Sequence, residues 1–300
     1  MTQELTFSKI TGHIGAEVHG ADLRQSLCDD QIHQIKDAIY QHHVLFFRDQ
    51  DINEQQQHEF ALRFGELQTQ TPHDVEPEFL RLEDTADKAP RSDKWHADHS
   101  CMKSPPGIAF LWAEHIPEYG GDTIWVSLPA IYRSLSPKMR SLMEQLKVRH
   151  GVRNGYGAGV RRRLTEYGMP KDEVDARIAK LEAEGFAIHP LVRTHRVTGE
   201  QGIFVSPNYV EHIDELHPEE SQLLLEFLNR KLDDVHFQVR WRWRAKDLAI
   251  WDNASTNHRA LSDHFHIEPQ YRAMRRCVVQ GGVPFFQPST DPASDMAVAA

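Results

Sequence analysis

Two histidines and one aspartate in this sequence have the chemistry of a metal site. His96 and Asp98 are separated by one residue, and residues two apart on a β-strand project from the same face, so both side chains can reach one ion. The tripeptide alone is weak evidence, because the chain has 19 histidines and His212-Ile213-Asp214 repeats the pattern. A third ligand is required. His258, which follows an apolar stretch and a turn, is the candidate.

Two imidazoles and one carboxylate occupy half of an octahedron and leave the other half open. Non-haem Fe(II) oxygenases use this ligand set, and the open positions take a bidentate 2-oxoacid and then O2. A zinc-dependent hydrolase could use the same side chains around a metal-bound water. A non-catalytic metal-binding protein with a cupin-like barrel is a further alternative. The ligand set alone leaves these alternatives open.

Two arginines near the C-terminal end favour the oxygenase. Arg272 and Arg276 lie four apart in a strand-like run, so both project to the face that also carries Met274, about 13 Å apart at ~3.3 Å per residue. Arginine binds carboxylate and sulfonate groups in a bidentate manner, and two on one wall fit two anions held beside a metal. A zinc hydrolase has no use for such a clamp. A surface strand with scattered positive charge is the alternative for this run.

The composition limits the classes of protein and partner. The chain has 300 residues, 40% hydrophobic and 26% charged, which is ordinary for a globular protein. Its net charge of −10 repels nucleic acid and anionic membranes, so neither is an expected partner, and the alternating arginines at 240, 242 and 244 indicate a solvated strand face. No apolar stretch approaches the ~20 residues of a membrane span. Three widely spaced cysteines predict a protein of the reducing cytoplasm.

Short strands separated by a few helices predict an α+β fold. Apolar periodicity and helix-start signals indicate helices over residues 29–41, 53–64, 137–147 and 218–232. Short apolar or alternating runs indicate strands over residues 44–47, 107–112, 123–126, 202–205, 237–243, 248–251 and 271–280. Residues 1–300 are expected to form a single domain around a double-stranded β-helix (jelly-roll) core with flanking helices. A charged helical insertion or lid is expected at about residues 157–186, and a disordered tail at about residues 288–300.

An ordered set of short motifs resembles the taurine dioxygenase/2,4-dichlorophenoxyacetate dioxygenase family of Fe(II)/2-oxoglutarate-dependent oxygenases. The resemblance covers nearly the whole chain, and the order of the motifs is specific although each motif is weak alone. The motifs lie at residues 14–23, 47–50, 63–67, 95–98, 105–107, 120–123, 189–195, 237–243, 251–258 and 272–276.

The resemblance implies an enzyme with Fe(II), 2-oxoglutarate and O2. By the resemblance, His96, Asp98 and His258 bind the iron, and they are the catalytic centre. Arg272 and Thr123 hold the distal carboxylate of 2-oxoglutarate. The implied reaction couples decarboxylation of 2-oxoglutarate to succinate and CO2 with hydroxylation of a substrate C–H bond.

The resemblance also implies a small anionic organic substrate. By the resemblance, Arg276 meets the anionic group of the substrate, and the backbone N–H of His99 contacts the same group. Tyr156 and Tyr209 occupy positions where taurine dioxygenase has phenylalanines that line the substrate pocket. The implied substrate is a sulfonate, an alkyl sulfate or an aryloxy or other carboxylate, and the hydroxylated product often breaks down. The family forms homodimers and homotetramers, so a homo-oligomer is expected.

Two further positions of the predicted substrate pocket depart from the taurine dioxygenase pattern. Gln70 takes the place of a histidine that helps to hold the sulfonate, and His73 is a nearby substitute. Ser92 replaces an asparagine ahead of the metal motif. Together with the two tyrosines, these departures argue against taurine and suggest a more polar substrate or one with a hydrogen-bonding group.

Overall fold

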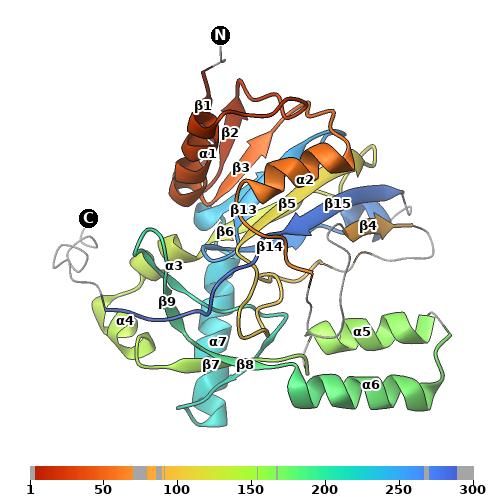
Figure 1. Cartoon of the computed structure of the whole chain (residues 1–300). Coiled ribbons are helices and arrows are strands. Elements are labelled where there is room, and N and C mark those ends of the chain that lie inside the picture. Colours follow the sequence, from red (N-terminus) through yellow and green to blue (C-terminus); the bar gives the residue numbers. More distant parts are fainter. Residues whose placement is uncertain are drawn as a thin grey trace.

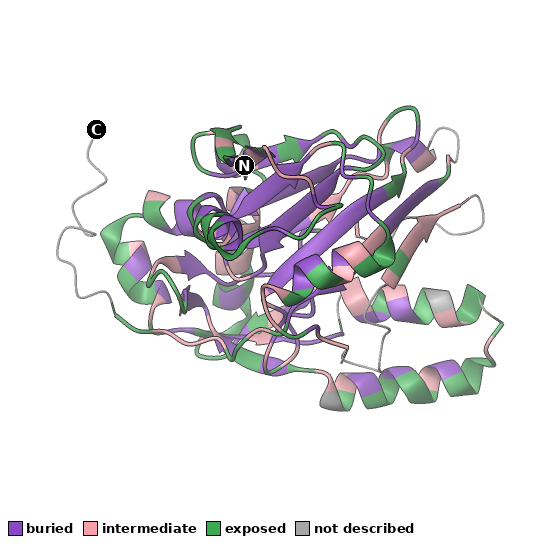
Figure 2. Ribbon diagram, turned by 45° about the horizontal axis from the view of Figure 1, so that its top comes forward, coloured by how far each residue is buried: buried purple, intermediate pink, exposed green. Residues whose placement is uncertain are grey.

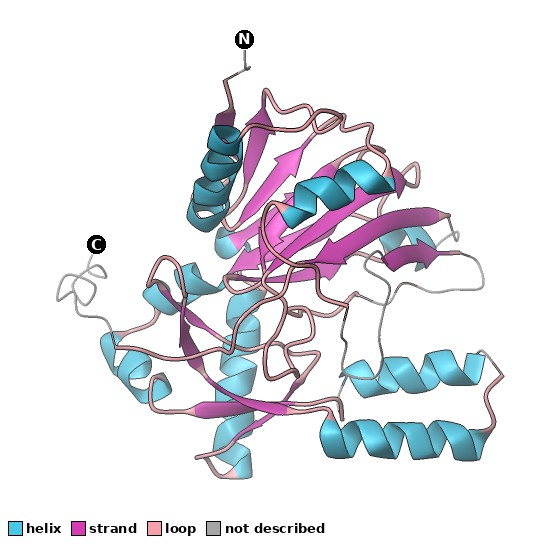
Figure 3. Ribbon diagram, in the orientation of Figure 1, coloured by secondary structure: helices cyan, strands magenta, loops and turns pink. Residues whose placement is uncertain are grey.

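The largest element of the structure is a seven-stranded sheet. The computed structural model describes residues 4–69, 80–85, 90, 92–153, 155–166, 168–266 and 270–288, and combines helices with sheets as predicted (Figures 1 and 3). The strand order is β1-β2-β3-β13-β5-β15-β4, and only the β2–β3 pair is parallel. In this order the bounds are Thr6–Lys9, Ala16–His19, Val44–Phe47, Leu248–Asp252, Ile108–His115, Arg272–Val278 and Leu80–Asp84.

A three-stranded antiparallel sheet packs against one face of the large sheet. Its strands are β12 (Gln238–Trp241), β6 (Thr123–Ser127) and β14 (Thr256–Ala260), in that order. The two sheets share one hydrophobic cluster, in which the Phe46 ring stacks on Trp241 at 4.1 Å and meets the edge of Trp125 at 5.3 Å. This aromatic packing makes the strands rigid supports for polar side chains at their ends.

Two helices cover the other face of the large sheet. They are α1 (Asp29–His42) and α2 (Glu54–Leu62), and Figure 2 shows the buried strands that lie beneath them. The predicted apolar stripe of α1 is buried, and Asn53 caps α2 by accepting a hydrogen bond from the Gln56 N–H at 2.9 Å. Both helices agree with the sequence prediction to within two residues.

Helices and small sheets cover the outer face of the three-stranded sheet. The helices are α3 (Leu128–Ser134), α4 (Pro137–Met143) and α7 (Pro218–Leu232), of which α3 and α7 contribute buried apolar side chains to one cluster with β6. The small sheets are β11-β7-β8, with bounds Val210–Ile213, Lys147–His150 and Ala187–Pro190, and β10-β9, with bounds Gln201–Ile203 and Val192–Thr194.

The charged insertion contains two helices that lie side by side. They are α5 (Gly155–Glu166) and α6 (Lys171–Glu184), and they extend away from the sheets (Figures 1 and 3). Val160 packs against Val174 and Ile178 in a small cluster of their own. The sequence predicts helical structure here but not two helices, because α5 begins in a glycine-rich stretch that disfavours helix.

A predicted helix and a predicted strand are shorter in the structure. The helix expected to reach residue 147 ends at Met143, because Lys147 already pairs with Pro190 in the β7–β8 ladder. The run expected as a strand over 237–243 begins with the short 3-10 helix η1 (Val235–Phe237), and β12 ends at Trp241. The last described helix, α8 (Asp263–His266), lies ahead of β15.

All three cysteines are free thiols, and two of them, Cys101 and Cys277, are buried. Each helix of the described ranges is too short or too polar to cross a bilayer. Two predicted substrate residues, Gln70 and His73, and the tail beyond residue 288 lie outside the described residues.

Candidate active site

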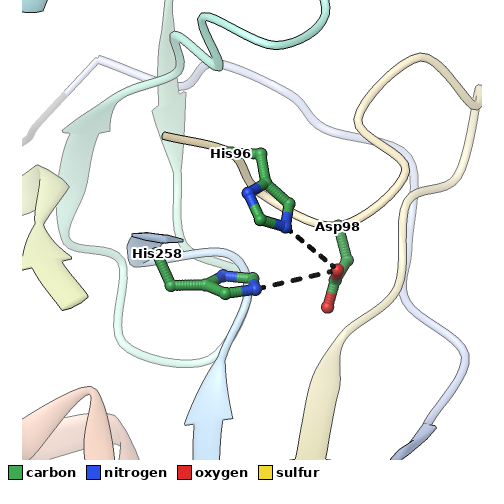
Figure 4. Close-up of side chains that lie close together, drawn as sticks. All are labelled: His96, Asp98 and His258. Carbon is green, nitrogen blue, oxygen red and sulfur yellow. Dashed lines mark ion pairs between the residues drawn. The ribbon is translucent and has the colours of Figure 1, made fainter. Parts of the chain in front are cut away.

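His96, Asp98 and His258 converge on one point, as the sequence predicts (Figure 4). The Oδ1 atom of Asp98 lies 3.9 Å from the Nε2 atom of each histidine, and one potential ligand atom from each residue lies within 4.8 Å of the others. All three side chains are buried. The competing tripeptide His212-Ile213-Asp214 is exposed at the two polar residues and belongs to no such cluster among the described residues.

The backbone brings the three residues together in a way that differs partly from the prediction. His96 and His258 pair through two hydrogen bonds, His96 N–H to the His258 carbonyl at 3.0 Å and the reverse at 2.8 Å. His96 therefore extends the edge of the small sheet beside β14. Asp98 is not on a strand, because it begins a turn in which His99 has φ +43°. The turn, rather than strand alternation, directs the carboxylate to the histidines.

The donor set fits a divalent metal ion. The Nδ1 atom of His96 lies 2.8 Å from the Lys94 carbonyl, which requires the proton on Nδ1 and leaves the lone pair on Nε2 toward Asp98. His258 packs against the Trp251 ring at 4.7 Å, so its orientation is restricted by packing. Two imidazole nitrogens and one carboxylate oxygen are the ligands that Fe(II) takes in non-haem oxygenases.

The protonation states also suit a metal. Burial lowers the pKa of His258 to about 3, with a further contribution from His96, and burial likewise lowers the pKa of His96. Burial alone would raise the pKa of Asp98, but Arg276 and the two histidines hold it well below its usual range. At neutral pH the site thus presents two neutral imidazoles and one carboxylate, the forms in which these groups bind metal.

Arg272 is a buried cation whose ion-pair partner, Asp84, is too distant for a hydrogen bond. Its Nη1 atom lies 3.7 Å from Asp84 Oδ2, beyond hydrogen-bond distance, and its Nε has no hydrogen-bond partner among the described residues. Burial lowers its pKa. A carboxylate ligand would supply the missing acceptors. The chain can approach so closely here because Gly121, at φ +71°, has no Cβ; one would lie 3.2 Å from Arg272 Cδ.

Thr123 is prepared to donate a hydrogen bond into the same cavity. The indole N–H of Trp243 donates to Thr123 Oγ1 at 3.0 Å, so the hydroxyl proton remains available for another acceptor. Thr123 is buried at the start of β6 and lines the cavity together with Arg272. The pair therefore presents a guanidinium and a hydroxyl to the cavity.

Arg276 lies on the metal side of the same strand face. Its Nη2 atom lies 3.0 Å from Asp98 Oδ2, and the side chain is buried. Met274 between the two arginines is fully buried, whereas Arg275 on the opposite face donates a hydrogen bond to Gln57 of α2 at 2.6 Å. The predicted alternation of β15 is therefore correct, and the alternative of a surface strand is wrong.

One cavity of about 390 Å³ connects these groups. It is lined by every described residue that the sequence assigns to the site: His96, Asp98, His258, Thr123, Arg272, Arg276, His99, Tyr156, Tyr209 and Ser92. The rings of Tyr156 and Tyr209 lie 5.0 Å apart, and His99 lies 6.4 Å from Tyr156. A larger hollow of about 490 Å³ beside residues 279–285 contains none of the predicted residues, so volume alone does not identify the site.

Sequence reasoning missed several residues of the site. Asn208, Trp251 and Arg162 also line the cavity, and Asn253 binds the backbone of Asp98. Trp251 and Asn253 lie in the stretch that leads to His258, which was a usable signal. Arg162 lies in the charged insertion, whose sequence pattern predicts helical structure but identifies no particular residue of the site.

Comparison with known proteins identifies the chain. Two histidines, one carboxylate and a buried arginine share one cavity, which is the arrangement of an Fe(II)/2-oxoglutarate-dependent dioxygenase. A family model described as taurine catabolism dioxygenase TauD, TfdA family matches residues 6–278. The chain belongs to this family, and it is an Fe(II)/2-oxoglutarate-dependent dioxygenase.

Relatives and solved structures agree with this assignment. The chain is 32% identical to an alkylsulfatase of Acinetobacter baylyi, over 94% of this chain and 87% of the relative. It is 31% identical to an alpha-ketoglutarate-dependent sulfate ester dioxygenase of Pseudomonas putida, over 94% and 91%. A taurine dioxygenase structure from Burkholderia xenovorans matches with a TM-score of 0.76 at 29% identity, over 98% of this chain and 99% of that one. The structure of AAD-2 in complex with Mn(II) and N-oxalylglycine also has a TM-score of 0.76, at 26% identity over 94% and 100%.

Proposed function

We propose that this dioxygenase hydroxylates a small organic anion, a sulfate ester, a sulfonate or a carboxylate such as an aryloxy acid. The observation that carries the proposal is the position of Arg276. This buried cation lines the same cavity as the three metal-site residues, and its Nη2 atom lies 3.0 Å from Asp98 Oδ2. It is a separate group from Arg272, which lines the cavity too. A second buried guanidinium in such a cavity favours a second anion. Two relatives are named an alkylsulfatase and a sulfate ester dioxygenase, and these names support sulfate esters as candidate substrates.

The residues divide between the metal, the co-substrate and the substrate. His96, Asp98 and His258 would hold Fe(II), which, with 2-oxoglutarate and O2, supplies the oxidising chemistry that inserts oxygen into a C–H bond. Arg272 and Thr123 bind the distal carboxylate of 2-oxoglutarate, one through its charge and one through its hydroxyl proton. These contacts would fix the orientation of the co-substrate.

The substrate residues determine which carbon is oxidised. Arg276 and the His99 backbone N–H bind the anionic group, so that the neighbouring carbon faces the metal. Tyr156 and Tyr209 form the wall that contacts the substrate body, and their phenol groups favour a substrate with a hydrogen-bonding group. Ser92 also lines the cavity, and Gln70 and His73 remain predicted contacts. Hydroxylation of the carbon next to a sulfate or ether oxygen yields a product that breaks down to an aldehyde and the released sulfate or phenol.

The finer architecture is part of the proposal. We infer that the two facing sheets form a double-stranded β-helix and that residues 1–300 are one domain. The face-to-face packing of the seven-stranded and three-stranded sheets and the likeness to solved relatives support this. A homodimer or homotetramer in the cytoplasm is the expected assembly, and light scattering measures its mass.

Succinate release tests the proposed function. Purified protein with Fe(II), 2-oxoglutarate and O2 is offered short alkyl sulfates, alkanesulfonates and aryloxyacetates, together with uncharged alcohols of equal size. Substrate-dependent succinate with anions supports the proposal, and turnover of uncharged compounds alone refutes it. Addition of 2-oxoglutarate to the anaerobic Fe(II) protein must produce a visible charge-transfer band, which the zinc hydrolase alternative does not predict.

A further inference from the structure

One face of α5 forms part of the cavity wall. Gly155, Tyr156, Gly159 and Arg162 all line the cavity. Their spacing of three and four residues places them on one side of the helix. Val160 packs toward α6 instead. The insertion therefore supplies a wall to the active site, and this wall contains two glycines and a tyrosine and ends with a cation.

Neither the backbone conformation nor steric crowding requires a glycine at position 159. The φ of Gly159 is not in the left-handed region, and a Cβ added there would have no neighbour within 4 Å among the residues that the structure describes. Its neighbours differ, since a Cβ at Gly155 would lie 2.2 Å from Asn208 Oδ1 and one at Gly157 would lie 2.1 Å from the Val152 carbonyl oxygen. Glycine is unfavourable in a helix, so the open space at Gly159 needs another explanation.

Arg162 lies about 10 Å farther along the helix axis than Gly155, at ~1.5 Å per residue. Its Nε atom lies 3.7 Å from Glu166 Oε1, beyond hydrogen-bond distance, and the side chain is 53% exposed. Arg81, which also lines the cavity, is committed to Glu114 through two hydrogen bonds of 2.9 Å. Arg161 pairs with Asp175 of α6 and lies off the cavity. Arg162 is thus available to an anion at the mouth.

We propose that this face of α5 selects substrates by the length of their carbon chain and by the chemical group at the end remote from Arg276. The anionic group is held at Arg276, the carbon chain passes over Gly159, and a polar or anionic far end meets Arg162. The substrate class is an elongated organic sulfate or sulfonate with an acceptor or second anion at its far end. This inference rests on the proposed function and adds the determinant of substrate length.

The length determinant is tested with Gly159→Leu and a matched control, Ala158→Leu. Ala158 is the adjacent exposed residue on α5 and does not line the cavity. Succinate release is measured with linear alkyl sulfates and alkanesulfonates from two to ten carbons. We expect Gly159→Leu to raise KM at least tenfold for chains of six or more carbons and to leave two-carbon substrates unchanged. Ala158→Leu should retain the wild-type profile.

The far-end contact is tested with Arg162→Gln and Arg161→Gln, using alkyl sulfates with and without a terminal carboxylate. We expect Arg162→Gln to raise KM about tenfold for the carboxylated compounds alone and Arg161→Gln to change neither set.

The outcomes separate the two proposals. Identical chain-length profiles for Gly159→Leu and Ala158→Leu overturn the length determinant, and equal effects of the two arginine variants overturn the far-end contact. If the wild-type protein releases no substrate-dependent succinate from any anion, the proposed function itself fails, and this inference fails with it. The charge-transfer band with 2-oxoglutarate verifies that each variant retains a folded site.

Discussion

Asn253 holds the backbone of Asp98 on both sides. Its Oδ1 accepts a hydrogen bond from the Asp98 N–H at 2.8 Å, and its Nδ2 donates to the Asp98 carbonyl at 3.2 Å and to the Pro106 carbonyl at 3.0 Å. The Asn253 carbonyl in turn accepts a hydrogen bond from Arg193 Nη2 at 2.8 Å. Because Asp98 lies in a turn, these bonds fix the direction of its carboxylate.

Replacement of Asn253 by serine is therefore expected to weaken metal binding. The shorter side chain loses the bonds to both sides of Asp98, and loss of groups that orient a metal ligand typically weakens affinity about 10–100-fold. The measurement is titration of the protein with Mn(II) or Co(II). Asn257→Ser is the control, since Asn257 is equally buried and its Nδ2 donates to the Val205 carbonyl at 2.7 Å. Equal loss of affinity in both variants would refute the positioning role of Asn253.

The metal-free protein is expected to lose stability as the pH falls from about 6.5 to 4. Burial lowers the pKa values of His43 and His189 to about 4. Between these values and the unfolded value near 6.5, the unfolded chain binds more protons, so the free energy of unfolding decreases with falling pH, by up to about 1.4 kcal/mol per pH unit for each histidine. Urea unfolding at several pH values measures the slope.

His189→Gln identifies one contribution to this slope. His189 Nε2 lies 2.9 Å from the Ser100 carbonyl, a bond that glutamine can also donate, whereas glutamine does not titrate. The variant should lose stability less steeply between pH 6.5 and 4. An unchanged slope would show that His189 is not a source of the acid sensitivity.

Removal of the Trp243 indole donor is expected to weaken 2-oxoglutarate binding. In Trp243→Phe, Thr123 Oγ1 loses its bond from Nε1, so the hydroxyl is no longer oriented. Thr123→Val removes the hydroxyl itself and should have the larger effect, about tenfold or more in the KM for 2-oxoglutarate, equivalent to one hydrogen bond of about 1.5 kcal/mol. Titration of the anaerobic charge-transfer band measures the affinity. An unchanged affinity in Thr123→Val would remove Thr123 from the co-substrate site.

The sequence predicts the part of the site that follows from local pattern. Arg272 and Arg276 follow from strand alternation, because β15 is buried on both faces and keeps its period. His258 can be predicted because it comes directly after an apolar strand and a turn. The direction of the Asp98 carboxylate cannot be predicted locally, because it depends on Asn253, 155 residues away in the sequence.

The missed elements also depend on distant contacts. The glycine-rich start of α5 disfavours helix in isolation, and the helix forms because Val160 packs against α6. Thr123 and Trp243 lie 120 residues apart, so the pairing that orients the hydroxyl has no local signal. The predicted helix that begins at residue 137 is too long because Leu146 continues its apolar period. In the structure Leu146 is buried in the link to β7 instead.

Arg276 should affect both the substrate and the metal. Arg276→Gln removes the cation that we propose binds the substrate anion, and loss of one charge-assisted bond of about 1.5–3 kcal/mol is expected to raise the substrate KM by about 10–100-fold. The same change removes the guanidinium that lies 3.0 Å from Asp98 Oδ2. In the wild type this guanidinium lowers the pKa of the Asp98 carboxyl. Since the pKa of Asp98 then rises, protons compete with the metal at higher pH, and metal affinity should fall more steeply on acidification than in the wild type.

Arg275→Gln is the matched control for this prediction. Arg275 is the adjacent residue of β15 but lies on the opposite face, where it binds Gln57 and stacks over Trp112. Its replacement should leave the substrate KM and the pH dependence of Mn(II) binding unchanged, whatever its effect on stability. If both variants raise the substrate KM equally, the effect comes from damage to β15 and not from loss of an anion contact. A raised KM with unchanged pH dependence in Arg276→Gln would retain the substrate role and exclude the influence on Asp98.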